Sequence, residues 1–207
     1  LEGLFERLRQ NLLADLDGQD FFEISFGDTV SFRNMSLLLH FMSDLCPLKL
    51  FDLLNRHVIE GAAALVSEVG DLGEACLLNL TVLHRIGLEI LERIRECGSD
   101  APLSGSGLRK IADSIAPSTH LSRKGVTSDA LLHRKIQASV LAAQIVGDVL
   151  GFGLLGGIDA KEVGESILSK HFSPLLEPML AALSPLGEDA PDQCASSTGP
   201  ALVHLSL

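Results

Sequence analysis

The chain has 207 residues, of which 46% are hydrophobic and 21% are charged, and its formal net charge is -11. A chain of this length and hydrophobicity buries a sizeable core, which excludes disorder for the bulk of the sequence. The negative charge argues against a nucleic-acid backbone as ligand, and the absence of Trp and Tyr argues against a platform for stacking bases or sugar rings.

The first part of the chain predicts helices separated by turn residues. Apolar residues at helical spacing indicate a helix over residues 4–16, which Gly18 ends. Residues 21–32 alternate in the manner of a small β-hairpin, and an irregular loop pinned by its Phe side chains is the alternative. Asn34 then suits the N-cap of a helix over residues 35–46.

Two longer helices are predicted next, over residues 48–69 and 72–97, each with one broad apolar face. The Gly- and Ser-rich stretch 98–107 predicts a loop between two halves of one domain. A short helix follows over residues 108–115. Residues 187–207 are rich in Gly, Pro and Ser, so we expect a flexible C-terminal tail.

The most distinctive stretch is residues 127–157, where a capped helix carries the basic residues Arg134 and Lys135 in its first turns and continues into the apolar segment 139–157. Glycines in this segment recur in pairs four residues apart, at Gly147, Gly151, Gly153 and Gly157. Such spacing of small residues lets two helix backbones approach closely. We therefore predict an all-α protein, a single globular bundle over residues 1–186 with this apolar helix at its centre. A short stack of helical hairpins is the alternative.

No motif predicts a cofactor, a metal site or a catalytic centre. Residues 151–156 match the letters G-x-G-x-x-G, but they follow a helix and lie near its C-terminus, where the helix dipole disfavours a phosphate. The four cysteines and seven histidines lack the spacing of metal ligands, and no nucleophile motif is present. We therefore expect no cofactor, and an enzyme is not favoured. The sequence leaves the compartment open, with the cytoplasm favoured.

The leading functional hypothesis is a regulatory or protein-binding module with a protein partner, docked in a groove between the helices 48–69 and 72–97. The first alternative is conditional membrane insertion of the segment 139–157 when Asp148 is protonated, with Arg134 and Lys135 at the lipid surface. The second alternative is a carrier that holds an apolar ligand in an enclosed cavity. The candidate interaction or insertion residues are Gly147, Asp148, Gly151, Gly153, Gly157, Arg134 and Lys135.

Overall fold

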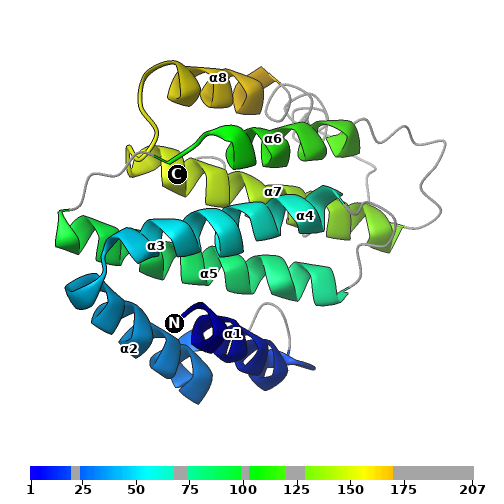
Figure 1. Ribbon diagram of the computed structural model, residues 1–207. Coiled ribbons are helices and arrows are strands. Elements are labelled where there is room, and N and C mark those ends of the chain that lie inside the picture. The colour runs from blue at the N-terminus through cyan, green and yellow to red at the C-terminus, as the bar shows by residue number, and fades with distance from the viewer. Residues whose placement is uncertain (20–23, 68–73, 99–102, 120–128, 170–207) are drawn as a thin grey trace, which may run out of the picture.

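The computed structural model describes residues 1–19, 24–67, 74–98, 103–119 and 129–169 (Figure 1). Every regular element within these ranges is a helix, which confirms the all-α class. The predicted tail, residues 187–207, lies outside the described residues. The α-helices are α1 (Glu2–Leu16), α2 (Val30–Leu45), α3 (Leu48–Leu53), α4 (Glu60–Ser67), α5 (Glu74–Cys97), α6 (Ser106–Thr119), α7 (Asp129–Gly151) and α8 (Gly157–Ile167).

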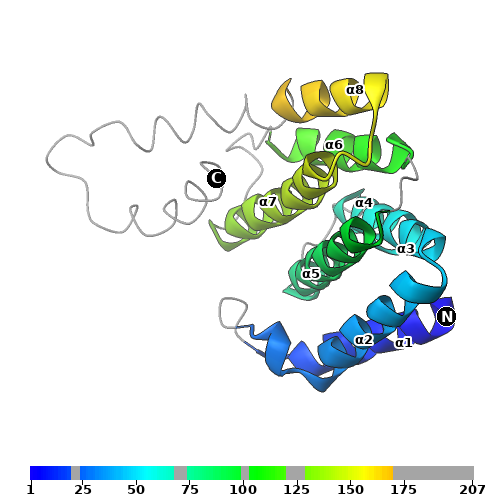
Figure 2. The ribbon, with the colours of Figure 1, turned by 90° about the vertical axis from the view of Figure 1, so that its left-hand side faces the viewer.

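The helices form layers stacked on one another (Figure 2). Helices α1 and α2 make one outer layer, α5 packs with α3 and α4 in the next, α6 packs with α7 in the third, and α8 covers α6. The central helix is α5, which contacts α1, α2, α3, α4 and α7. The prediction that the glycine-spaced segment forms the central helix is therefore wrong.

The composition of the two helices explains why α5 takes the central place. On α5, large side chains are buried on several sides of the helix, including Leu80, Val82 and Ile86, none of which is exposed to solvent. On α7, the buried positions include the small residues Ala138 and Ala142, and the glycines do not face another helix. A helix with large apolar side chains around much of its circumference gains most from burial between two layers.

The predicted hairpin at residues 21–32 is wrong wherever the structure describes it. Phe26–Asp28 form a single 3₁₀ turn, and α2 begins at Val30. The side chain of Thr29 accepts a hydrogen bond from the backbone N–H of Phe32 at 3.3 Å. Thr29 is therefore the N-cap of this helix, and not Asn34, because a hydroxyl at this position satisfies a backbone donor in the first turn. Residues 21–23 lie outside the described residues.

The predicted helix over residues 48–69 is confirmed from Leu48 to Ser67, with a π-helical segment, Leu54–Ile59, between α3 and α4. A π turn holds an extra residue and bulges toward its neighbours. Two glycines accommodate this bulge. A Cβ atom on Gly87 of α5 would lie 3.1 Å from Val58, and one on Gly107 of α6 would lie 2.7 Å from Ile59. Glycine therefore permits close approaches of α5 and α6 to the π segment.

Candidate functional site

Exposed apolar side chains are concentrated at one end of the stack. Nine large hydrophobic residues are exposed in the described part of the chain, and seven of them lie on or beside α1 and α2 or at the first residue of α3. We call these seven the α1–α2 apolar face: Leu1, Leu4, Val30, Leu37, Phe41, Leu45 and Leu48. The other two, Ile158 and Leu168, are on or directly after α8, in the layer farthest from α1 and α2 (Figure 2).

The centre of this face is a strip along α2. Leu37, Phe41 and Leu45 are four residues apart, so they are neighbours on one side of the helix. Their exposed fractions are 66%, 56% and 66%. The ammonium group of Lys49 lies 3.9 Å from the Glu2 carboxylate, so the start of α3 is beside the start of α1. This contact places the apolar side chains of both segments at the same end of the strip.

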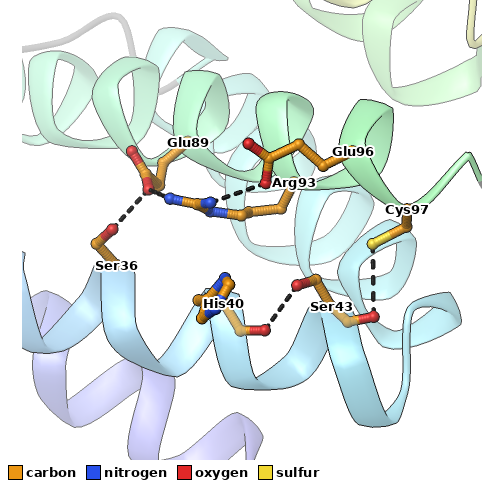
Figure 3. Close-up of polar contacts among 7 residues, drawn as sticks. All are labelled: Ser36, His40, Ser43, Glu89, Arg93, Glu96 and Cys97. Carbon is orange, nitrogen blue, oxygen red and sulfur yellow. Dashed lines mark hydrogen bonds and ion pairs between the residues drawn. The ribbon is translucent and has the colours of Figure 1, made fainter.

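Polar contacts behind the strip determine which side of α2 faces inward (Figure 3). The Ser36 hydroxyl donates to Oε1 of Glu89 on α5 at 2.6 Å, and the Arg93 guanidinium donates to the same oxygen at 2.9 Å. About two turns farther along both helices, the Cys97 thiol donates to the backbone carbonyl of Ser43 at 3.4 Å. Because Ser36 and Ser43 face α5, the strip that contains Leu37 faces away from the core.

Glu89 is the charged residue at the middle of these contacts and is only 7% exposed. Burial by itself would raise the pKa of its carboxyl group. Hydrogen bonds from Ser36 and Arg93, together with the positive charges of Arg93 and Arg85, outweigh burial and lower the pKa below its usual value. Glu89 is therefore ionised at neutral pH, and it holds α2 on α5 through charge-assisted hydrogen bonds.

The glycines singled out in the sequence do not bring helices together. A Cβ atom on Gly147, Gly151, Gly153 or Gly157 would meet nothing within 4 Å. Gly147 and Gly151 are exposed on α7, which ends at Gly151 and does not continue to residue 157. Gly153 and Gly157 have φ values of 68° and 60°, in the region that favours glycine, and they shape the turn between α7 and α8. No other helix in the described part of the chain therefore packs closely against these glycines.

Asp148 is half-buried and has a partner on α5. Its Oδ2 atom lies 2.8 Å from Nε2 of His84. This pair borders a hollow of only about 10 Å³ between the π segment, α5 and α7, which Leu54 and Val58 help to line. The predicted groove between the helices 48–69 and 72–97 is therefore filled by side chains at this point. The apolar surface is instead on α1 and α2.

None of the helices within the described ranges combines the length and apolarity needed to cross a bilayer.

The structure places the predicted basic residues Arg134 and Lys135 near the start of α7. Arg134 is half-buried on α7, and Lys135 is on the same helix, with a side chain outside the described part. Arg109 on α6 is paired with Asp159 and Glu162 of α8, and its Nη2 atom lies 3.0 Å from the Glu162 carboxylate. That arginine therefore attaches α8 to the stack.

A half-open cleft of about 790 Å³ lies between the end of α1 and the first turns of α5 and α7. Its described lining includes the apolar residues Leu13, Leu16 and Leu77 and the polar residues Asn79 and Arg134. Both ends of the Asn79 side-chain amide are hydrogen-bonded: its oxygen accepts from Arg9, and its nitrogen donates to the Ala75 carbonyl. The cleft has the volume of a ligand site, but it is not the enclosed apolar cavity that a carrier requires.

Sequence reasoning missed the α1–α2 apolar face because the functional hypotheses rested on the segment 139–157 and on a groove between the helices 48–69 and 72–97. A signal was present, however. Met35, Leu39 and Met42 supply the buried side of α2, while Leu37 and Phe41 add apolar side chains on the other side. A helix that is apolar on both sides is expected to be covered on both sides.

Comparison with protein-family models, curated proteins and solved structures found no match for this chain. The functional proposal therefore rests on the side chains and surfaces described above.

Proposed function

We propose that the chain is a protein-binding helical module that docks a protein partner on the α1–α2 apolar face. The observation that carries this proposal is the concentration of seven of the nine exposed large apolar residues on that face. A helix on the surface of a globular protein normally carries polar residues on its outer side. A terminal layer with a continuous apolar strip along α2 departs from that pattern, and exposed patches of this kind mark interaction sites.

Energetics favour the strip as the anchor of the interface. Full burial of a Leu or Phe side chain contributes about 1.5–3 kcal/mol. Leu37, Phe41 and Leu45 are each more than half exposed, so a partner that covers them gains several kcal/mol in total. The contacts of Glu89 with Ser36 hold α2 in place before the partner arrives, which limits the ordering that binding requires.

The test compares two exposed apolar positions at opposite ends of the stack. A photo-crosslinking amino acid replaces Phe41 in one variant and Ile158 in the other, and the adducts are identified by mass spectrometry. We expect a defined protein adduct at position 41 and none at position 158. The identified partner is then purified, and its affinity is measured for the parent, Phe41→Glu and Ile158→Glu.

An aromatic anchor at the centre of an interface commonly contributes at least about 2 kcal/mol, so Phe41→Glu should weaken binding about 30-fold or more while Ile158→Glu leaves the affinity unchanged. Circular dichroism checks that both variants remain folded. Equal adducts at the two positions, or an unchanged affinity for Phe41→Glu, would refute the proposal. Conditional membrane insertion and transport of an apolar ligand stay predictions from the sequence.

A further inference from the structure

The charged residues beside the α2 strip are arranged symmetrically. Arg33 and Asp44 are both exposed, and they lie on either side of Leu37 and Phe41 along the helix. The midpoint of Arg33 and Asp44 lies between residues 38 and 39, and the midpoint of Leu37 and Phe41 is residue 39. Arg33 and Asp44 are also separated by just over three helical turns, so they lie on the same flank of the strip. The Nε–H group of Arg33 donates to the Gly27 carbonyl at 3.0 Å, which uses one of its five N–H donors.

This symmetry has a geometric consequence for two copies of α2. A two-fold interface requires a self-complementary surface, in which one residue contacts a second residue of the partner and the second contacts the first. If two α2 helices pack antiparallel about residues 38–39, Leu37 lies opposite Phe41 of the other copy. Arg33 then lies opposite Asp44 of the other copy on the same flank. A parallel two-fold arrangement would instead place the two Arg33 side chains on opposite flanks, so Arg33 would not meet Asp44 of the other copy.

We propose that the partner of the α1–α2 apolar face is a second copy of this chain, bound as a two-fold symmetric dimer through antiparallel α2 helices. This inference rests on the proposed function, because it uses the same apolar face. Leu37 and Phe41 form the centre of the interface. Two Arg33–Asp44 pairs, one at each end, determine the antiparallel direction, which is the role that complementary charges take at interface rims.

The first measurement is the mass of the full chain in solution by analytical ultracentrifugation at concentrations up to about 100 µM, where a dimer of micromolar affinity is well populated. We expect a monomer–dimer equilibrium for the parent and for Ile158→Glu. Phe41→Glu should weaken dimerisation about 30-fold or more. A parent chain that stays monomeric over this range would overturn the inference.

Charge reversal tests the orientation independently of the apolar contacts. Arg33→Glu and Asp44→Arg each place like charges opposite one another at both ends of the dimer, so each variant alone should dimerise about tenfold more weakly than the parent. In an equimolar mixture the two variants carry opposite charges on α2, and they should form a heterodimer with the affinity of the parent. Failure of the mixture to recover that affinity would overturn the antiparallel dimer. Thermal unfolding of each variant checks that the monomer is intact.

The crosslinking experiment separates this inference from the proposed function. An adduct of the chain with itself at position 41 supports both. An adduct with a different protein, together with a monomeric parent, overturns the dimer and leaves the protein-binding role in place. A monomeric parent with no adduct at position 41 overturns both.

Discussion

Replacement of Glu89 by Gln should destabilise the protein in a way that depends on pH. Gln keeps the shape of the side chain and an oxygen that can accept from Ser36 and Arg93, but it removes the negative charge. A hydrogen bond to a charged group contributes about 1 kcal/mol more than a neutral one, and two such bonds end on the Glu89 carboxylate. The expected loss at neutral pH is therefore about 2 kcal/mol, equivalent to a fall in Tm of about 4–8 °C for a domain of this size.

The pH dependence follows from the direction of the pKa shift. Because the pKa of Glu89 is lowered in the folded protein, its ionised form contributes stability above the unfolded pKa. That contribution is lost as the pH falls through the folded pKa. Glu89→Gln lacks this contribution at every pH. The difference in unfolding free energy between parent and variant should therefore be about 2 kcal/mol near pH 7 and shrink as the pH falls through the folded pKa of Glu89.

Urea denaturation monitored by circular dichroism measures both free energies at each pH. Glu96→Gln is a matched control, since Glu96 also accepts from Arg93, at 2.8 Å, but its side chain is 57% exposed. This control should change stability by less than about 1 kcal/mol at every pH. A Glu89→Gln effect as small as that of Glu96→Gln, or one of equal size above and below the folded pKa, would contradict the role assigned to the buried carboxylate.

Two further predictions concern glycines and the half-buried ion pair. Gly107→Ala should destabilise the protein by about 1–3 kcal/mol, because its Cβ atom would lie 2.7 Å from Ile59. Gly147→Ala should instead stabilise the protein by about 0.5–1 kcal/mol, since that glycine is in a helix with open space around it. Equal effects of Gly107→Ala and Gly147→Ala on the free energy of unfolding in urea would contradict the packing at the π segment. Asp148→Asn should change stability by less than about 1 kcal/mol, because the carboxylate that meets His84 is 34% exposed, and a loss above about 2 kcal/mol in the same assay would show that this pair is effectively buried.

The sequence by itself determined the class of the fold and most helix positions. Apolar spacing placed helices close to their observed bounds, most clearly for α5, which was predicted over residues 72–97 and found from Glu74 to Cys97. Periodicity records which residues on one helix lie on the same side. It failed at residues 21–32, where a short alternating stretch turned out to contain the cap and first turn of α2.

Only the tertiary structure decided which helix is central and which apolar surface is left uncovered. Hydrophobicity drew attention to the glycine-rich segment of α7, but burial depends on the neighbours that surround a helix, and α5 has more of them. Gly107 and the π segment meet across residues distant in sequence, so no local pattern could show their contact. The exposure of Phe41 on α2 also depends on the packing of neighbouring helices. The sequence of a helix does not distinguish an apolar side chain that faces a core from one that faces a binding surface.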